Sequence, residues 1–324
     1  MKNVAIIVPQ SSVLQAIADP QYCFSAVNQF MEMAGQKSLF NVMLIGATPE
    51  IKLNNGQYAV FPDKLITDTF KADLVFIPAL FGDLPHAIEL NKPLTNWITK
   101  QYEAGAELAS LCLGAFLLAS TGLLAGKKCS THWGFSNQFK AMFPDVDLQD
   151  GQIITEENRI YSSGGANSYW NLLLHLVEKY SDRATAIMVS KYFAIDIDRN
   201  SQSAFAMFSG QKAHKDETVS KAQEYIETNI EARITVEELA EKVALGRRSL
   251  ERRFKQATHN TVMEYVHRVK MEAAKRSFES SRKNINEVMQ DVGYTDTKAF
   301  RSKFKQVTGL TPLAYRNKYN RMVN

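Results

Sequence analysis

Apolar residues follow two different rhythms along this chain of 324 residues. Up to about residue 195, short runs rich in Val, Ile and Leu alternate with longer segments in which apolar residues recur at helical spacing. From Val219 onward only the helical spacing remains. Alternating strands and helices build a sheet that is covered by helices on both faces. We therefore expect an α/β three-layer sandwich with a mainly parallel sheet, followed by an all-α domain.

Short apolar runs predict strands in the α/β part, at residues 4–8, 40–45, 73–78 and 106–111, with weaker ones at 152–155 and 159–161. Helical spacing predicts helices at 24–34, 94–102, 113–122, 166–180 and 183–193. A polar stretch that contains several serines follows, with Phe205 and Phe208 as its apolar members. We expect a first domain at 1–197, a linker at 198–217 and a second domain at 218–324.

The all-α part contains an internal repeat. The run Phe254–Thr258 recurs as Phe304–Thr308, which is a shift of 50 residues. Upstream the shift becomes 49, as in the pair Val236 and Ile285. The second copy therefore has one extra residue between its two helices. A repeat of this kind is a duplicated supersecondary unit rather than a low-complexity segment.

Each copy has the pattern of a helix, a tight turn and a second helix, so the all-α domain should hold two helix-turn-helix units. In the first copy Thr235 and Glu238 have the spacing of a capping box, and Leu245–Gly246 is the expected turn. In the second helix of each copy, apolar residues four apart, ending at Phe254 and Phe304, should face the core.

The residues opposite this buried stripe are mostly basic or carry a hydroxyl group. They are Arg247, Arg248, Glu251, Arg252 and Lys255 in the first copy, and Thr297, Lys298, Arg301, Ser302 and Lys305 in the second. Arg and Lys bind the guanine edge, Glu accepts from cytosine, and Ser and Thr suit several bases. One such helix is most often a solvated surface, but two matching copies indicate DNA binding. Nearby, we expect Arg253, Lys270 and Lys303 to hold phosphates.

The charge distribution is compatible with a DNA-binding second domain but is weak evidence by itself. The formal net charge is +4. Residues 218–324 contain 21 Lys and Arg against 13 Asp and Glu, whereas residues 1–217 contain 17 against 21. A basic half joined to a mildly acidic half is compatible with a polyanion-binding domain attached to another function, and also with ordinary solvated surfaces.

Residues 218–318 resemble the AraC/XylS-type DNA-binding domain over its whole length, including the closing pattern from Val307 to Arg316. The resemblance implies two recognition helices that enter adjacent major grooves, tied by a long helix at 262–278. It places base contacts on Arg248, Glu251, Arg252, Lys298, Arg301 and Ser302. Because the two outer faces differ, one protomer should read two unlike subsites one helical turn apart rather than a palindrome.

In the α/β part, Cys112 stands between an expected strand and the start of a helix, which is the pattern of a nucleophile elbow. A thiol at a helix N-terminus is biased toward thiolate, and His132 is a possible base partner. The alternatives are that Cys112 is a small buried core residue, or that it is a redox switch, although no resolving cysteine lies beside it in sequence.

The segments 115–127, 131–133, 161–165 and 173–178 resemble the class I glutamine amidotransferase-like, or PfpI-like, superfamily. Its fusion to an AraC-type domain resembles GlxA-type regulators. Enzymes of the superfamily carry a carboxylate after the first strand and glycines after the third. Here residues 10–18 contain no acid, with Gln15 or Ala16 where it would lie, and the third strand is followed by Pro78-Ala79-Leu80-Phe81. An oxyanion hole is therefore not expected.

These departures favour an effector pocket over a catalytic centre, with candidates Cys112, Leu113, His132, Phe81 and Trp133. We expect a transcription regulator that forms a homodimer and binds double-stranded DNA and a small effector. The resemblance to GlxA-type regulators implies that it is an activator and that the effector is a nitrogenous metabolite. The alternative is a cysteine-dependent amidase, protease or deglycase that carries a DNA-binding domain.

No apolar run is long enough for a signal peptide or a membrane span, so we expect a cytoplasmic protein without membrane contact. The three cysteines and six histidines show no disulfide framework and no ligand spacing for a metal. We therefore expect neither a metal nor another cofactor.

Overall fold

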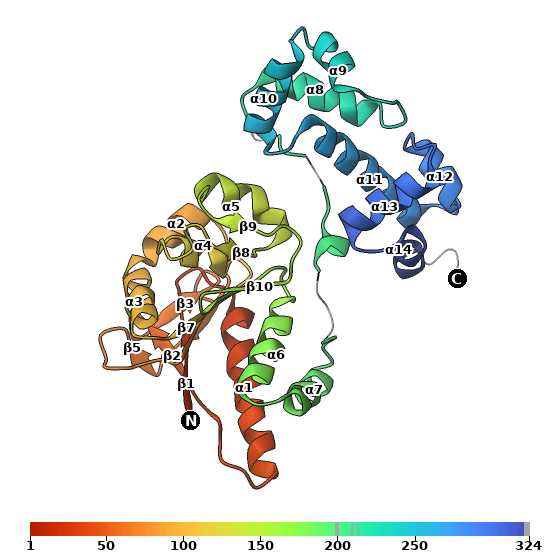
Figure 1. The fold of residues 1–324 in the computed structure, drawn as a ribbon. Coiled ribbons are helices and arrows are strands. Elements are labelled where there is room, and N and C mark those ends of the chain that lie inside the picture. Colours follow the sequence, from red (N-terminus) through yellow and green to blue (C-terminus); the bar gives the residue numbers. More distant parts are fainter. Residues whose placement is uncertain (198–200, 209, 213, 321–324) are drawn as a thin grey trace. The chain divides into compact units, whose positions relative to one another are not determined.

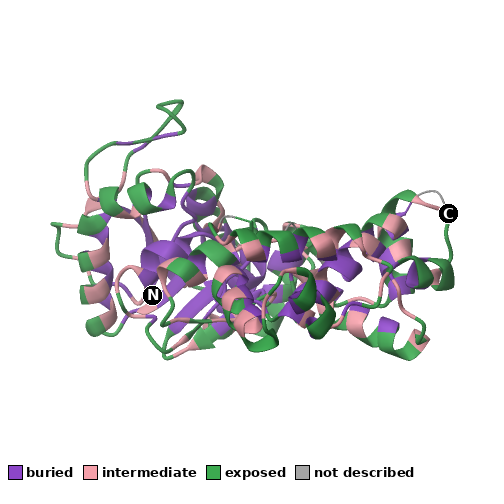
Figure 2. Ribbon diagram, turned by 90° about the horizontal axis from the view of Figure 1, so that it is seen from above, coloured by how far each residue is buried: buried purple, intermediate pink, exposed green. Residues whose placement is uncertain are grey.

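The computed structural model describes residues 1–197, 201–208, 210–212 and 214–320. Within this range the chain forms two compact units, which divide between Gln202 and Ser203 (Figure 1). The division lies inside the segment expected to be a linker, of which residues 198–200, 209 and 213 are outside the described range. Each unit has its own buried interior (Figure 2).

The first unit is built on a sheet of seven strands in the order β10-β11-β7-β6-β1-β2-β5. All neighbours in it are parallel except β10 and β11, which confirms the expected mainly parallel sheet. The strands are β1 (Lys2–Ile7), β2 (Phe40–Gly46), β5 (Lys64–Leu65), β6 (Leu74–Ile77), β7 (Glu107–Leu111), β10 (Ile154–Glu157) and β11 (Ile160–Ser163). Every residue of β6 is buried, as expected for a central strand of a parallel sheet that is covered on both faces.

Helices cover the sheet. On one side α1, α6 and α7 pack against one another, and α2, α3 and α4 lie on the other (Figure 1). The bounds are α1 (Leu14–Met33), α2 (Leu84–Leu90), α3 (Lys92–Glu103), α4 (Gly114–Ala119), α5 (Ser136–Met142), α6 (Tyr169–Tyr180) and α7 (Arg183–Tyr192), with a short 3-10 turn η1 at Trp133–Phe135. Two small ribbons lie outside the main sheet, β3 (Ile51–Leu53) with β4 (Tyr58–Val60) and β8 (Lys128–Cys129) with β9 (Asp147–Leu148).

The helix α1 begins ten residues before the predicted start at residue 24. Pro20 lies inside it and would by itself argue for a break, since proline removes one backbone hydrogen bond. Ile17, Pro20 and Phe24 are nevertheless buried on one face of the helix. Burial of this face outweighs the cost of the proline, which sequence spacing alone did not reveal.

The second unit consists entirely of helices, as predicted. They are η2 (Ser203–Phe205), α8 (Glu217–Thr228), α9 (Val236–Lys242), α10 (Arg247–Thr258), α11 (Val262–Ser280), α12 (Ile285–Asp291), α13 (Thr297–Thr308) and α14 (Pro312–Tyr319). The turn between α9 and α10 has four residues and the turn between α12 and α13 has five, which confirms the extra residue in the second copy.

Equivalent hydrogen bonds recur in the two copies. Thr235 and Glu238 form the expected capping box of α9, and Asn284 forms another on α12. The hydroxyl of Thr258 donates to the carbonyl of Phe254 at 2.8 Å, and Thr308 donates to Phe304 at the same distance. The repeat is therefore structural as well as sequential.

The helix α11 contributes to both hydrophobic cores of the second unit. Its first half packs Tyr265 and Val266 against α8, α9 and α10. Its second half packs Ala274 and Phe278 against α12, α13 and α14. One continuous helix therefore closes the first helix-turn-helix unit and opens the second.

Lys270 sits near the middle of α11 and is only 5% exposed. Its ammonium group donates to the carbonyl oxygens of Ala232, at 2.9 Å, and Val292, at 3.0 Å. Ala232 belongs to the first copy and Val292 ends α12 in the second, so the ammonium bridges the two copies. Its burial lowers the pKa of Lys270.

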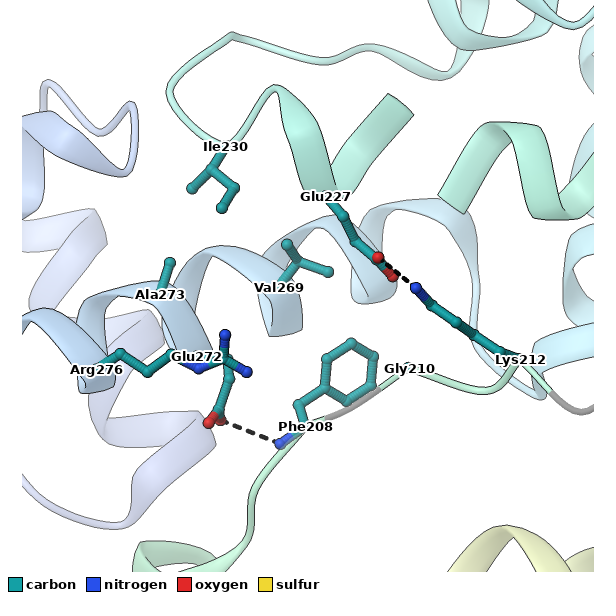
Figure 3. A pocket seen from close by; sticks show the side chains of 9 residues that line it. All are labelled: Phe208, Gly210, Lys212, Glu227, Ile230, Val269, Glu272, Ala273 and Arg276. Carbon is teal, nitrogen blue, oxygen red and sulfur yellow. Dashed lines mark hydrogen bonds and ion pairs between the residues drawn. The ribbon is translucent and has the colours of Figure 1, made fainter. Parts of the chain in front are cut away.

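The segment expected to be a linker packs against the second unit from Ser203 onward, in its described part. We call residues 203–208, 210–212 and 214–216 the strap. The backbone N–H of Phe208 donates to Glu272 of α11 at 3.1 Å, and Lys212 pairs with Glu227 of α8 at 2.6 Å (Figure 3). The ammonium of Lys275 donates to the carbonyl of Ala206. These contacts fix the strap to the second unit, beside a pocket that α8 and α11 also line.

The turns of the two copies differ in their left-handed residue. In the first copy that residue is Ala244, with φ 54°, so the turn begins one residue before the predicted Leu245–Gly246. In the second copy it is Gly293, with φ 70°. A Cβ atom on Gly293 would overlap the carbonyl oxygen of Glu231 and crowd the ammonium of Lys270. Glycine is therefore required at this position by space as well as by φ.

We expect Gly293→Ala to reduce the free energy of unfolding of the second unit by about 2 kcal/mol or more, because it adds left-handed strain to a steric overlap. All three tryptophans, Trp97, Trp133 and Trp170, lie in the first unit. Urea unfolding of the full chain should therefore show an earlier transition by far-UV circular dichroism and an unchanged one by tryptophan fluorescence.

The matched control is Gly246→Ala, at a position with φ −71° and open space around an added Cβ atom. It should shift the circular dichroism transition far less. Equal shifts for the two variants would contradict the role assigned to Gly293.

Candidate functional site

The outer face of α10 carries the residues predicted to bind DNA in the first copy. Arg248, Arg252 and Lys255 are exposed. Among the described residues none forms a hydrogen bond or an ion pair with these three side chains. The opposite face is fixed in the core by Leu250 and Phe254, which are fully buried. The helix therefore presents three cations on a rigid support.

Two other predicted residues of this face are engaged with each other. The Nε atom of Arg247 donates to Glu251 at 3.3 Å, and Arg247 also pairs with Glu237 of α9. These carboxylates raise the pKa of Arg247. Arg247 and Glu251 would have to exchange this pairing for contacts with DNA, whereas Arg248 and Arg252 would not.

On α13 the five predicted residues lie together. Thr297, Lys298, Arg301, Ser302 and Lys305 line one surface pocket with Thr311, the N-cap of α14. The helix is capped by Asp296, whose carboxylate accepts from the backbone N–H groups of Lys298 and Ala299. Phe300 and Phe304 are fully buried behind this face. The second copy thus also exposes a polar, basic helix face, and its opposite face is fixed in the core by Phe300 and Phe304.

Two of the flanking cations expected to hold phosphates, Arg253 and Lys270, are engaged in contacts within the second unit. Arg253 forms a bidentate pair with Asp216, at 2.7 and 2.8 Å, and Asp216 is the N-cap of α8. This pair joins α10 to α8, and its hydrogen bonds lower the pKa of Asp216. Lys270 is the buried bridge described above. Both cations serve the packing of the second unit, which their residue type alone does not reveal. Lys303 donates to Gln306 at 2.8 Å.

In the first unit Cys112 has the backbone of a nucleophile elbow, with φ 53°. It follows β7 directly and precedes α4. A Cβ atom on the neighbouring Gly114 would overlap the carbonyl oxygen of Ile77, so the close approach of α4 to the end of β6 requires glycine. A left-handed conformation in a non-glycine residue costs about 1–3 kcal/mol, which the surrounding packing must offset.

The chemistry of this elbow differs from that of an activated nucleophile. Cys112 is 5% exposed, and its burial raises the pKa of the thiol to about 12. His132 caps the 3-10 turn η1, where its Nδ1 atom accepts from the backbone N–H of Gly134 at 3.1 Å. Burial lowers the pKa of His132. Neither residue has the electrostatic environment that favours a thiolate paired with an imidazolium.

The segments expected to lack catalytic groups are used in packing. The backbone N–H of Phe81 donates to the carbonyl of Ser11 at 2.7 Å. The phenyl ring of Phe81 is 70% exposed, whereas Leu113 is 8% exposed. Asp19, just beyond the stretch without acids, accepts from the hydroxyl of Tyr169 at 2.6 Å and the indole N–H of Trp170 at 3.0 Å. This carboxylate joins α1 to α6.

Sequence reasoning missed Gln202, which is connected to the elbow region through Thr131. The hydroxyl of Thr131 donates to the carbonyl of Cys112 at 3.2 Å. The carbonyl of Thr131 in turn accepts from the side-chain amide of Gln202 at 2.9 Å, and the same amide accepts from the backbone N–H of Trp133. Gln202 lies in the expected linker, and no motif marks it.

The described residues contain no cluster of three or more His, Cys, Asp or Glu side chains placed to hold a metal ion. Over the same residues, no helix has both the length and the apolar character needed to cross a lipid bilayer.

Comparison with known proteins bears out the family resemblance of both units. Residues 25–179 match the family model of the DJ-1/PfpI family, and residues 239–318 match that of a helix-turn-helix domain. The chain is 28% identical to the HTH-type transcriptional regulator GbdR of Pseudomonas aeruginosa, over 67% of this chain and 59% of the relative. It is 24% identical to the HTH-type transcriptional regulator CdhR of the same species, over 80% of this chain and 76% of the relative.

Among solved structures, an AraC family transcriptional regulator from Pseudomonas putida is matched over its whole length and 60% of this chain, with a TM-score of 0.50 and 16% identity. That likeness concerns the fold alone. The chain spans less than two thirds of the length of GbdR. It joins a DJ-1/PfpI-type domain to an AraC-type helix-turn-helix domain.

The raised pKa of Cys112 leads to a test. At pH 8 a thiol with a pKa of about 12 is almost entirely protonated, and only the thiolate reacts. We expect iodoacetamide to label Cys112 of the folded chain at least about a hundredfold more slowly than it labels glutathione. Mass spectrometry of the peptide that contains Cys112 measures the rate, and the urea-unfolded chain provides the control, in which labelling should be fast. Rapid labelling of the folded chain would contradict a protonated, buried thiol.

Proposed function

We propose that this chain, in which a DJ-1/PfpI-type domain precedes an AraC-type domain, is a sequence-specific DNA-binding transcription regulator controlled by a small effector. The observation that carries the DNA-binding part is the pair of outer faces on α10 and α13. Each has exposed cations in front and a fully buried apolar stripe behind. The names of the relatives GbdR and CdhR, both HTH-type transcriptional regulators, support the same assignment.

The base contacts follow from which side chains are available. Arg248 and Arg252 on α10, and Lys298, Arg301 and Ser302 on α13, are exposed. Glu251 would contact a base once Arg247 releases it. Thr297, Lys255 and Lys305 border the two faces, where contacts to phosphate orient a helix without reading sequence. The faces differ in composition, so the operator should contain two unlike subsites.

We also propose that the first unit binds rather than transforms its ligand. Cys112 is protonated at neutral pH, and the backbone N–H of Phe81 is bonded to the carbonyl of Ser11 instead of being available to an oxyanion. The effector pocket would lie around Cys112, Leu113, His132 and Trp133, with Phe81 at its edge, at the carboxyl ends of the parallel strands where open α/β sheets bind ligands. A small nitrogenous metabolite is the proposed effector, a homodimer the proposed assembly, and activation the proposed output.

Substitution of two neighbouring arginines of α10 tests the DNA-binding proposal, because Arg252 is exposed and Arg253 is paired with Asp216. We expect Arg252→Ala to weaken binding to an operator, selected from random DNA by the wild-type chain, by roughly 1–3 kcal/mol, and to relax preference at one base pair. Fluorescence anisotropy at fixed salt measures the affinity. The unfolding transition by circular dichroism should not change, because the guanidinium of Arg252 has no partner among the described residues.

Arg253→Ala is the matched control. It breaks the pair with Asp216, so it should lower the stability of the second unit while base preference stays the same. If Arg252→Ala leaves specific binding at the wild-type level, the assignment of α10 as a recognition helix is wrong.

The effector proposal has its own test. In a thermal-shift screen of nitrogen-containing metabolites, a true effector should raise the melting temperature reported by tryptophan fluorescence, since all tryptophans lie in the first unit. It should also alter the affinity of the full chain for the selected operator. A compound series without any shift would remove the support for effector control.

A further inference from the structure

The last residue of the first unit is inserted into the region proposed as the effector pocket. Ser201 pairs with Gln152 in an isolated bridge, and the backbone N–H of Gln202 donates to the carbonyl of Gly151 at 2.8 Å. The side chain of Gln202 then points into the unit, where the residue is 2% exposed. A polar side chain this deeply buried must have its hydrogen bonds satisfied inside the protein.

The carboxamide of Gln202 has three backbone partners. Its nitrogen donates to the carbonyl of Thr131 at 2.9 Å and to that of Gln152 at 3.2 Å. Its oxygen accepts from the N–H of Trp133 at 3.2 Å. Both N–H groups and the oxygen are therefore bonded, by groups that are fixed in the fold. Two acceptors and one donor in this arrangement are complementary to a primary carboxamide.

Gly164 makes space for this group. A Cβ atom on Gly164 would overlap the amide nitrogen of Gln202 and lie 2.7 Å from the carbonyl oxygen of Thr131. The next residue, Gly165, has φ 73°, and a Cβ atom there would overlap the hydroxyl of Ser168. Both glycines follow β11. The carbonyl of Ser163, the last residue of β11, accepts from the backbone N–H of Cys112 at 3.0 Å. We call this surround, formed by Thr131, Trp133, Gln152, Gly164 and Gly165, the amide cradle.

The cradle is next to the elbow. Thr131 accepts from Gln202 through its carbonyl and donates to the carbonyl of Cys112 through its hydroxyl. Trp133 contributes its N–H to the cradle, and its ring stacks beside His132, with 5.2 Å between the ring centroids. The cradle therefore shares residues with the proposed effector pocket.

We propose that Gln202 is a built-in ligand of this site, and that the effector carries a primary carboxamide which displaces it. The proposal rests on the proposed function and names the chemical class of its effector. An incoming carboxamide would remake the same three hydrogen bonds, so the exchange would leave no buried carbonyl or N–H group unpaired. The rest of the effector would supply the binding energy that favours it over the tethered side chain.

Displacement would have a consequence for the second unit. Ser203, the first residue of the strap, follows Gln202 directly, and the strap is bonded to α8 and α11. While Gln202 is in the cradle, the beginning of the strap is held at the first unit. When the effector takes its place, the three side-chain hydrogen bonds of Gln202 are lost, while the bridge of Ser201 to Gln152 and the bond from the Gln202 backbone N–H to Gly151 can remain. Effector binding and seating of the Gln202 side chain in the cradle are thus mutually exclusive.

The proposal can be tested on the full chain by hydrogen–deuterium exchange and chemical rescue. Gln202→Ala removes the amide and should accelerate exchange of the Trp133 N–H at least about tenfold, because its acceptor is gone. Acetamide, which has the structure of the group that the substitution removes beyond Cβ, should reverse the acceleration in Gln202→Ala at tens of millimolar. It should have little effect on the wild type, where the tethered amide has a higher effective concentration.

Gln202→Glu keeps the size of the side chain but turns a carboxylate oxygen toward the carbonyls of Thr131 and Gln152. It should also accelerate exchange at Trp133 at pH 8, which separates loss of the hydrogen bonds from creation of a cavity. The control is Gln36→Ala, an exposed glutamine after α1, which should leave exchange at Trp133 unchanged. The fluorescence-detected unfolding transition verifies that each variant is folded.

Unchanged exchange at Trp133 in Gln202→Ala would overturn the proposal. Acceleration that acetamide does not reverse would overturn the assignment of a carboxamide as the ligand. The regulator function is measured separately, by binding of the wild-type chain to its selected operator. Failure of DNA binding with the expected exchange results would contradict that function and leave the amide cradle intact.

Discussion

The second unit depends on one helix that belongs to two hydrophobic cores. The first half of α11 is buried with α8, α9 and α10, and the second half with α12, α13 and α14. Its 19 residues span about 28 Å at the rise of an α-helix. Since α11 is continuous, the two outer faces are fixed relative to each other.

Lys270 strengthens this constraint at the point where the two cores meet. Its ammonium bonds carbonyls from both copies, and Gly293 leaves the space that this requires. A buried cation of this kind is costly to desolvate, and its lowered pKa reflects that cost. Since the unfolded chain binds the proton more tightly, the stability of the second unit should rise as the pH increases through the folded pKa of Lys270 toward its unfolded value. The two hydrogen bonds of Lys270 are directional, so they fix the orientation of the two copies more closely than apolar packing alone would.

The sequence allowed the repeat, its extra residue and the buried stripes of α10 and α13 to be predicted, because apolar periodicity and capping residues are local signals. The exposed faces followed from the same periodicity. The contacts of Lys270 and Arg253 could not be predicted, because residue type alone does not say whether a lysine or arginine contacts a phosphate, a carbonyl or a carboxylate. The start of α1 was missed because packing outweighs Pro20, and the ribbon of β3 and β4 because its strands have three residues each. Gln202 lies in no motif, and only tertiary structure brings it to Thr131.

The first unit has the backbone of a nucleophile elbow, and the groups around it are engaged in packing and hydrogen bonds. The left-handed Cys112 and the close contact at Gly114 remain, because both are consequences of how β7, α4 and β6 pack. What remains at the end of the sheet is a set of backbone carbonyl and N–H groups around a buried amide. Gln202 is followed directly by Ser203, so a change at this site reaches the second unit through the chain itself. Three hydrogen bonds at about 1 kcal/mol each hold the Gln202 carboxamide, so a ligand that did not replace them would leave their backbone partners unpaired. Displacement of Gln202 therefore selects for a ligand with the same pattern of donors and acceptor.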